Sequence, residues 1–386
     1  MAGKSSKYFI LIFLALFAFA PTVFGATTPC IWTGVEKIVA IGDIHGDYEN
    51  FLPLLQGTGL VDQSLHWAGG KTHLVQIGDI MDRGTRAKDV LDLLMRLEKE
   101  AEAAGGMVHV LIGNHEELNI TGATFDYEGY VTIEQFVSFL PEDFRKKQEE
   151  KYVSKLSAED KARVEIQGLD LASDENLRLF WDKLLQENAD AKRAYVRNFN
   201  DIYGKWFLQK NAVIKINDIV FCHGGISKEY SSWKLQDINN SLRSELSIFA
   251  ESAVSLHLLD NSIRPRIVYD SSGPLWYRGM TGTDDAATEE EVTRILDKLK
   301  ARAMVVGHGF DLAHTQSPTV SLENIVRYNG RIYNINTGIN RIYHGLVAVL
   351  IIHNGEFGLY SIRKQQQAGE ASAQKDQDAA SPLKTE

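Results

Sequence analysis

The chain has little cysteine: only Cys30 and Cys222 occur among its 386 residues. So few cysteines exclude a scaffold held together by several disulfides. With 44% hydrophobic residues, the chain is long enough to bury one large core without them. In an oxidising compartment Cys30 can pair with Cys222, whereas the apolar segment around Cys222 equally suits a buried free thiol. The sequence leaves both states open.

Long apolar runs are also absent, apart from one near the start. Two lysines precede the apolar residues 8–20, which Pro21 separates from the small residue Gly25. This run is shorter than the ~20 residues that a membrane-spanning helix needs. The pattern is typical of a secretory signal peptide. We therefore expect residues 1–25 to be removed and the chain to be exported, to a periplasm or outside the cell, without a stable membrane span; a retained anchor is the alternative.

Positive charge is in deficit, because 41 Lys and Arg residues face 51 Asp and Glu residues, for a net charge of -10. Proteins that bind nucleic acids rely on Lys and Arg to neutralise phosphates. We therefore expect no nucleic-acid partner. The number of subunits is not indicated by the sequence.

Three short apolar segments each end in a glycine followed by a polar residue. They span residues 37–43, 73–79 and 108–114. Their length and composition predict buried β-strands. Helical patterns lie between them, at about residues 48–55 and 87–104. Strands that alternate with helices at this spacing predict βαβ units, and hence an α/β fold with a parallel sheet.

The polar residues that follow these strands are expected to meet in space. In such sheets the catalytic groups gather beyond the carboxyl ends of the strands. Two later apolar segments end in the same way, each with a histidine beside a glycine. The pattern therefore predicts one site built from Asp43, His45, Asp79, Asn114, His115, His223 and His308.

The rest of the chain divides by composition. Residues 133–210 contain charged helical stretches, which predict a helical insertion or cap over the sheet. Strands near residues 331–335 and 346–352 are expected to complete a second sheet with an earlier hairpin. Residues 364–386 are rich in Gln, Ala and Lys and predict a disordered tail. The folded domain is accordingly placed at residues 26–363.

The predicted cluster has the chemistry of a metal site. Carboxylates and imidazoles suit divalent iron, manganese or zinc, and one carboxylate can bridge two ions. Asp79 is the candidate bridge. Asp43 and His45 stand two residues apart on an extended segment, so both side chains can hold the first ion. The second ion is expected to be held by Asn114, His223 and His308, and a hydroxide bridging the two ions to attack phosphorus.

Further residues suit the handling of a phosphate ester. Guanidinium groups match phosphate oxygens, and Arg83 and Arg278 are the candidates; a structural or surface arginine is the alternative for each. His115 is expected to protonate the leaving oxygen. Asp82 is expected to orient that histidine, with a helix N-cap as its alternative role.

Four motifs stand in one order along the chain: Gly42-Asp43-Ile44-His45-Gly46, Gly78-Asp79-Ile80-Met81-Asp82-Arg83-Gly84, Gly113-Asn114-His115-Glu116 and His223-Gly224-Gly225. This set resembles the signature of the phosphoprotein phosphatases. The later segments Gly307-His308 and 273–279 resemble the bacterial Shewanella-like protein phosphatases within that family. The resemblance covers roughly residues 36–362.

The resemblance implies a fold, a metal centre and a set of roles. The fold is a four-layer α/β/β/α metallophosphoesterase sandwich with a helical insertion. The metal centre holds two divalent ions, manganese, iron or zinc, on the six ligands already named, with Asp79 shared. It implies that His115 is the catalytic acid and that Asp82 orients it. Arg83 and Arg278 are the implied phosphate-binding residues.

The implied activity is metal-dependent hydrolysis of phosphomonoesters on phosphorylated proteins or peptides. Shewanella-like members are associated with phosphotyrosine, which makes it the expected substrate. The interval from His115 to His223 departs from the eukaryotic pattern, because it is longer and the predicted helical insertion fills it. Two alternatives are a dinucleoside polyphosphate hydrolase, which export argues against, and a non-catalytic metal-containing binding protein.

Overall fold

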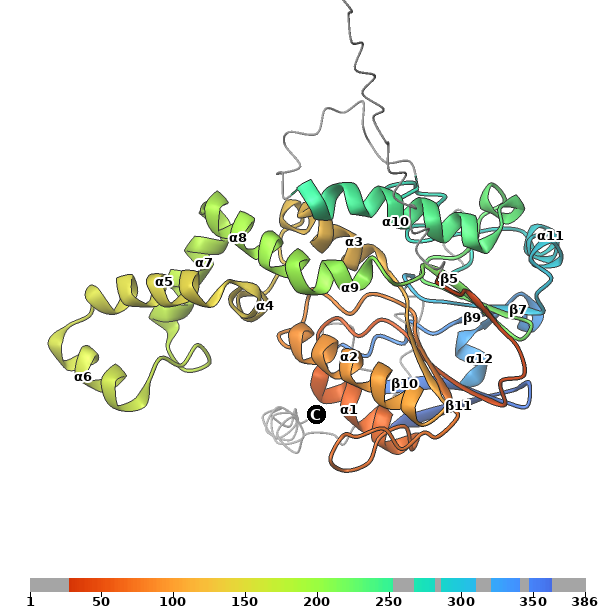
Figure 1. Cartoon of the computed structure of the whole chain (residues 1–386), viewed down its shortest axis with the longest axis horizontal. Helices are drawn as coiled ribbons and strands as arrows, with labels where there is room; N and C mark the ends of the chain where they lie inside the picture. Colours follow the sequence, from red (N-terminus) through yellow and green to blue (C-terminus); the bar gives the residue numbers. More distant parts are fainter. Residues whose placement is uncertain (1–27, 253–266, 282–285, 310–320, 341–346, 363–386) are drawn as a thin grey trace, which may run out of the picture.

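The computed structural model describes residues 28–252, 267–281, 286–309, 321–340 and 347–362 (Figure 1). The expected signal peptide at residues 1–25 and the expected tail at residues 364–386 lie outside the described residues, and export stays a prediction. Among the helices that the structure describes, none combines the length and the apolar character needed to cross a membrane.

The first sheet contains the three strands predicted from the glycine-terminated segments. Its order is β11-β10-β2-β3-β4, and β2, β3 and β4 run parallel, with Ile38 opposite His73 and His73 opposite Met107. The strands are β2 (Lys37–Ile41), β3 (His73–Gln76), β4 (Met107–Val110), β10 (Val347–His353) and β11 (Glu356–Ile362).

The second sheet has the order β1-β5-β6-β7-β9-β8. Within it β6, β7 and β9 run parallel, and β5 and β6 form the predicted hairpin. Its strands are β1 (Ile31–Trp32), β5 (Val213–Ile216), β6 (Ile219–Cys222), β7 (Ala303–Val306), β8 (Val326–Arg327) and β9 (Ile332–Asn334).

One late strand joins a different sheet from the one expected. β9 lies in the second sheet as predicted, but β10 pairs antiparallel with β2 in the first sheet, where Leu350 faces Ala40. Both sheets offer a buried apolar place to such a strand, so its own sequence does not specify its partner. The pairing depends on the hairpin that β10 forms with β11 and on the packing of α1 against both strands.

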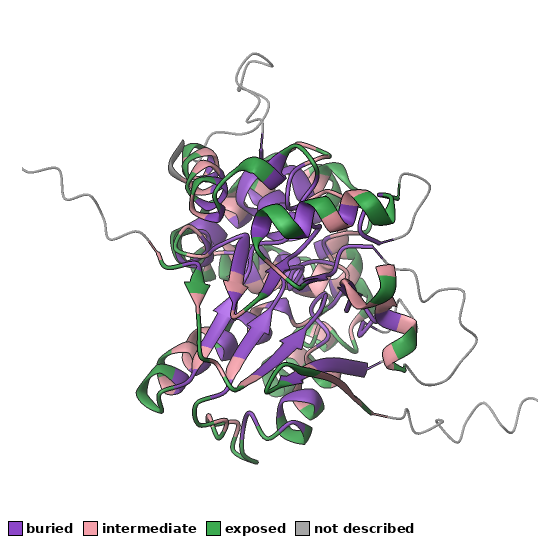
Figure 2. Cartoon of the chain, turned by 90° about the vertical axis from the view of Figure 1, so that its right-hand side faces the viewer, coloured by how far each residue is buried: buried purple, intermediate pink, exposed green. Residues whose placement is uncertain are grey.

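Helices cover the outer faces of the two sheets. In Figure 1, α1 (Tyr48–Gly57) and α2 (Ala87–Ala103) lie on the side of the first sheet, and α10 (Leu235–Ser252) and α11 (Glu289–Leu299) on the side of the second. Figure 2 shows that the buried residues concentrate in the strands between these helices. The predicted four-layer α/β/β/α arrangement is confirmed.

The first two helices begin and pack as their sequences dictate. The Asp47 side chain accepts the backbone N–H of Asn50 and caps α1. In α2 the buried residues Val90, Leu94 and Leu97 recur every three or four positions, which places one apolar stripe against β4. Both helices therefore fix the strand ends from which the polar residues emerge.

Residues 133–207 are mostly helical; the middle of this segment projects from the sandwich, and the helices at its two ends pack against the body. They comprise α4 (Ile133–Phe139), α5 (Glu142–Ser154), α6 (Ala158–Gln167), α7 (Glu175–Glu187), α8 (Ala189–Phe199), the π-helical turn η2 (Asn200–Gly204) and α9 (Lys205–Phe207). Figure 1 shows α5, α6 and α7, which we call the helical arm, extending to one side of the body. The base of the arm is stabilised by aromatic rings that stack or meet edge-on, those of Phe136, Phe139, Tyr195 and Phe199.

Both cysteines are free and buried. The disulfide alternative is therefore wrong and the free-thiol alternative is confirmed. Burial raises the pKa of Cys222 to about 12, so its thiol remains protonated and behaves as a small apolar side chain of β6.

Candidate metal centre and active site

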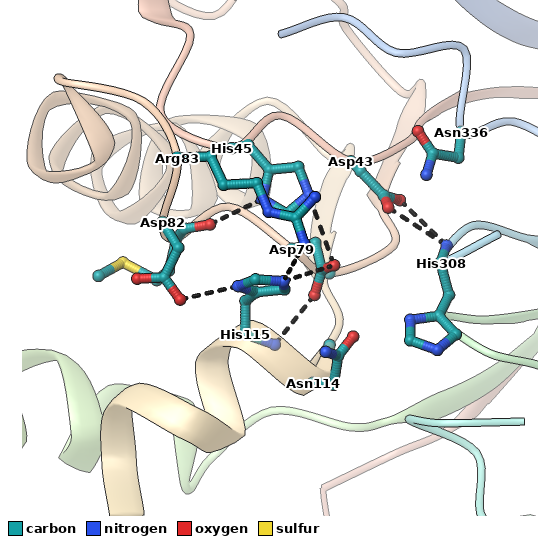
Figure 3. Close-up of polar contacts among 12 residues, drawn as sticks. Asp43, His45, Asp79, Asp82, Arg83, Asn114, His115, His308 and Asn336 are labelled. Carbon is teal, nitrogen blue, oxygen red and sulfur yellow. Dashed lines mark hydrogen bonds and ion pairs between the residues drawn. The ribbon is translucent and has the colours of Figure 1, made fainter. Parts of the chain in front are cut away.

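The predicted site residues lie where strands of both sheets end. Asp43, Asp79 and His223 follow β2, β3 and β6, while His308 follows β7. Asn114 begins the helix α3 (Asn114–Thr121) after β4. All are buried. The parallel strands thus bring to one place residues that are far apart in the sequence (Figure 3).

His223 is the centre of one group of potential ligands. Its Nε2 atom lies 3.2 Å from Asp79 Oδ1, 2.9 Å from Asn114 Oδ1 and 3.2 Å from His308 Nδ1. Its Nδ1 atom is 3.2 Å from the carbonyl oxygen of Ile77 and donates to it. That bond fixes the tautomer and leaves Nε2 available to a metal ion. This is the group predicted for the second ion.

His45 belongs to a neighbouring group around the same carboxylate. Its Nδ1 atom donates to the Met81 carbonyl at 2.9 Å, and its Nε2 atom lies 3.7 Å from Asp79 Oδ2. Since Asp79 Oδ1 faces His223, the two carboxylate oxygens of Asp79 face different groups. This is the geometry that the predicted bridging role requires.

Asp43, which follows β2 of the first sheet, completes the cluster by contacting a residue of the second sheet. Its carboxylate accepts the backbone N–H of His308, at 3.2 and 3.4 Å for its two oxygens (Figure 3). Its Oδ1 atom lies 4.0 Å from His223 Nδ1. The described structure therefore brings all six predicted ligands into one connected cluster.

His115 lies at the edge of this cluster, with its two nitrogens in different surroundings. Nδ1 is 2.7 Å from Asp82 Oδ2, and Nε2 is 3.9 Å from Asp79 Oδ2. Asp79, His45 and His115 thus also form a group close enough to hold one ion. The contact with Asp82 is the one predicted for an oriented acid, and it points Nε2 towards the cluster.

Asp82 is fully buried and saturated with hydrogen bonds. Besides His115, its carboxylate accepts from Asn119 at 3.0 Å, from Thr124 at 3.0 Å and from Gln135 at 2.7 Å. The N-cap alternative for Asp82 is wrong, because α2 begins only at Ala87. Sequence reasoning missed these three partners, since two of them belong to segments with no recognisable motif.

The two candidate arginines lie beside different residues of the site. The Nη2 atom of Arg83 lies 3.4 Å from His115 Nε2, and its guanidinium carbon is 4.8 Å from the ring centre of Tyr130. Arg278 is exposed, and its Nη1 atom donates to the backbone carbonyl of His308 at 3.3 Å. Both cations therefore lie next to residues of the predicted site.

The backbone of the site is strained. A non-glycine residue with a positive φ angle lies in a sparsely populated backbone region, at a cost of about 1–3 kcal/mol. Such residues cluster at functional sites. Close packing also requires a glycine before Asn114, because a Cβ at Gly113 would collide with the Asp79 carboxylate. The site residues with positive φ are His45 at 46°, Asp79 at 57°, Asp82 at 68°, Arg83 at 67° and His308 at 61°.

Glu116 holds this strained loop and was missed as a functional residue. Its buried carboxylate accepts the backbone N–H groups of Asp79 at 2.7 Å, Ile80 at 2.8 Å, Met81 at 3.1 Å and Gly113 at 2.9 Å. The only signal in the sequence is its place as the third residue of α3, from which an acidic side chain can accept the N-cap backbone N–H, here that of Gly113.

The electrostatics of the cluster call for additional positive charge. Burial raises the pKa of Asp43 to about 7, with Asp79 adding to the rise and His223 opposing it. Burial lowers the pKa of His45 to about 3. Burial opposes the charged form of His223 too, but the Asp79 and Asp43 carboxylates outweigh it and raise its pKa to about 9. Buried carboxylates that share a site are stable when a cation lies between them.

The atoms that face one another in the cluster suit metal ions. His308 turns its Nδ1 atom towards His223 Nε2, at 3.2 Å, so two imidazole nitrogens meet there. The surrounding ligands are carboxylate oxygens, imidazole nitrogens and an amide oxygen, a set that divalent cations prefer. The residues present therefore fit divalent metal ions.

The chain matches a known family over most of its length. The match is to the calcineurin-like phosphoesterases, and it covers residues 36–309. The chain belongs to this family. Members are metallophosphoesterases, which agrees with the ligand cluster just described.

Two relatives of this calcineurin-like phosphoesterase bear phosphatase names. Shewanella-like protein phosphatase 2 of Arabidopsis thaliana is 32% identical over 54% of this chain and 51% of the relative. Shewanella-like protein phosphatase 1 of Plasmodium berghei is 28% identical over 80% of this chain and 68% of the relative. The chain thus spans only about half of the Arabidopsis protein. The predicted resemblance to the Shewanella-like group is confirmed.

Solved structures show the same architecture. A cold-active protein tyrosine phosphatase superposes with a TM-score of 0.58 and 25% identity, over 87% of this calcineurin-like phosphoesterase and 81% of the other chain. Another structure, the cold-active protein-tyrosine phosphatase of a psychrophilic Shewanella species, superposes with a TM-score of 0.55 and 24% identity, over 87% and 82%. The second likeness concerns the fold alone.

Proposed function

We propose that this calcineurin-like phosphoesterase is a metal-dependent protein phosphatase that hydrolyses phosphomonoesters on phosphorylated proteins, with phosphotyrosine as its preferred residue. The observation that carries the proposal is the position of Asp79, whose two oxygens face two ligand groups beside the His115–Asp82 pair. The names of the Arabidopsis and Plasmodium relatives support a protein substrate. The 25% identical tyrosine phosphatase structure supports phosphotyrosine.

Two divalent ions, manganese, iron or zinc, would be held by the six clustered ligands. Asp43 and His45 would hold one ion, Asn114, His223 and His308 the other, and Asp79 both. When bound, the ions neutralise the phosphate and make a hydroxide available near neutral pH. The ligand types accept all three metals, so metal analysis of the purified protein would identify the ion.

The chain's own residues would bind and orient the phosphate and supply a proton. Arg83 and Arg278 flank the cluster and can each donate to phosphate oxygens. His115 donates Nδ1–H to Asp82, so its Nε2 atom is the one that can give a proton to the leaving oxygen. The hydrogen bonds to Asp82 keep that imidazole in place.

The direct test compares residues 26–386 with their Asp79→Asn variant. Both proteins would be loaded with manganese and assayed on matched phosphotyrosine and phosphoserine peptides, with circular dichroism to verify folding. We expect kcat/KM of the variant to fall by more than about 100-fold, because the shared ligand is lost. Asp62→Asn, a change at an exposed turn residue, is the matched control.

Other results would replace the proposal. Faster cleavage of diadenosine tetraphosphate than of either peptide would make the protein a dinucleoside polyphosphate hydrolase. Two bound metals without hydrolysis of peptides or nucleotide would make it a non-catalytic binding protein. A higher rate on phosphoserine than on phosphotyrosine would reverse the substrate preference alone.

A further inference from the structure

Two tyrosines form an aromatic wall beside the proposed acid. Tyr127 and Tyr130 stack with ring centres 4.8 Å apart and planes 12° apart. Tyr130 also lies against the site itself, because its ring centre is 4.7 Å from that of His115 and 4.8 Å from the Arg83 guanidinium carbon. The wall thus begins at two residues of the proposed machinery.

The wall is anchored to the same groups that hold the acid. It follows the short helix η1 (Ala123–Asp126), where Thr124 donates to Asp82 Oδ2 at 3.0 Å. The Tyr130 carbonyl accepts the backbone N–H of Arg83 at 2.6 Å, and the Tyr130 N–H donates to the Tyr127 carbonyl at 3.2 Å. The position of the two rings relative to His115 is therefore fixed by hydrogen bonds at both ends of the segment.

The outer ring of the wall remains open to solvent. Tyr127 is 43% exposed, Tyr130 is half-buried, and His115 is buried. Exposure therefore increases stepwise from the acid to the outer tyrosine. An exposed aromatic surface that continues into a polar site is the kind of feature that binds an apolar part of a ligand.

We propose that Tyr127 and Tyr130 select phosphomonoesters whose leaving group is an aromatic ring, which among phosphoproteins means phosphotyrosine. The inference rests on the proposed function and names the residues that would give it its specificity. The proton donor Nε2 of His115 must lie near the ester oxygen. Whatever is bonded to that oxygen then lies near Tyr130, whose ring is in contact with the His115 ring.

The two kinds of leaving group meet this wall differently. In phosphotyrosine the ring is bonded directly to the ester oxygen and can pack on the tyrosines, and aromatic contacts add to affinity beyond the area they bury. In phosphoserine a single methylene precedes the peptide backbone. During hydrolysis the bond from phosphorus to the phenolic oxygen breaks, the electron pair stays on that oxygen, His115 supplies the proton, and water supplies the new oxygen on phosphorus.

The test uses variants of the outer tyrosine, whose ring stacks on Tyr130. For Tyr127→Ala we expect kcat/KM on a phosphotyrosine peptide to fall by about 2- to 10-fold, mainly through KM, as the loss of one aromatic contact predicts. The value on the matched phosphoserine peptide should change by less than about 2-fold. Tyr127→Phe should retain the preference. Ile166→Ala, on α6 and 84% exposed, is the control for removing an exposed apolar side chain.

Small esters separate this inference from the proposed function. Phenyl phosphate and β-glycerophosphate offer the same contrast without a peptide. Suppose that the wild-type protein cleaves neither peptide, but Tyr127→Ala lowers kcat/KM for phenyl phosphate alone. The role of the aromatic wall would then be supported, and the proposed protein substrate would be rejected. Equal losses on aromatic and aliphatic esters, or no loss on either, would overturn the inference, provided that circular dichroism shows a folded variant.

Discussion

The metal cluster and the helical arm are built on opposite principles. In the cluster, side chains from both sheets are buried and cross-linked, and three of its six residues hold positive φ angles. In the arm, every residue of α6 is exposed or half-exposed, and many ion pairs join residues on the surface of one helix. Such surface pairs contribute little to stability. The cluster depends on its surroundings for its geometry, whereas α6 of the arm, which has no buried residue, depends mainly on local helix formation.

Metal removal should have the largest effect, and its direct target is the cluster. Without cations the Asp43 and Asp79 carboxylates share a buried site, which is unfavourable. We expect chelation to lower activity by more than about 1,000-fold and stability by about 3 kcal/mol, the amount that a ligand at ~100 times its Kd contributes. Calorimetry with and without manganese would measure the loss. An unchanged melting temperature in the apo form would contradict the view that the cluster needs cations for stability. Hydrogen exchange in α6 of the arm serves as the internal control.

Asp82→Asn should come next, with a loss of rate and little loss of metal. The amide still occupies the space but no longer fixes the charged form of His115. We expect kcat to fall by about 100- to 1,000-fold, the contribution of general acid catalysis. Measurement of kcat together with metal content distinguishes this from a structural defect. Asp89→Asn, at a half-exposed ion pair of α2, should leave kcat unchanged.

Glu116→Gln should weaken the support of the strained loop. The new amide NH2 would face backbone N–H donors that now point to a carboxylate oxygen. We expect metal affinity to fall by about 10- to 100-fold, as for other residues that orient ligands, and stability to fall by about 1–3 kcal/mol. Metal titration and urea unfolding test both. Glu142→Gln on the arm is the control, and equal behaviour of the two variants would remove the contrast between the regions.

Ile166→Lys should have the smallest effect. Its side chain is 84% exposed on α6, so a charged replacement loses little contact. We expect stability to stay within about 0.5 kcal/mol and kcat/KM on phenyl phosphate to be unchanged. A large loss of activity on this small substrate would show that the arm takes part in the chemistry. The contrast between the metal cluster and the helical arm would then be wrong.

Short-range patterns predicted much of the body and the whole ligand cluster. The glycine after each of β2, β3 and β4 marked where a polar residue leaves a buried strand, and parallel strands bring such ends together. The roles of the ten predicted site residues in catalysis and metal binding stay predictions. Their positions in the fold agree with those roles.

Long-range choices were not predictable in the same way. β10 fits either sheet by its own composition, and only its pairing with β2 places it. The direction of the helical arm is set by aromatic packing between α4 and α8, which residue spacing within one helix does not encode. Likewise, Gln135 and Thr124 reach Asp82 from segments without any motif.

The order of the ligands along the chain has a consequence for how the site matures. Asp43 contacts the backbone of His308 across a sequence separation of 265 residues. The first sheet contributes its ligands early in the chain, while the second supplies His223 and His308 much later. During synthesis the early ligands therefore emerge long before the last one, and non-local contacts of this length form slowly. The predicted ligand set is thus complete only after the two sheets have docked.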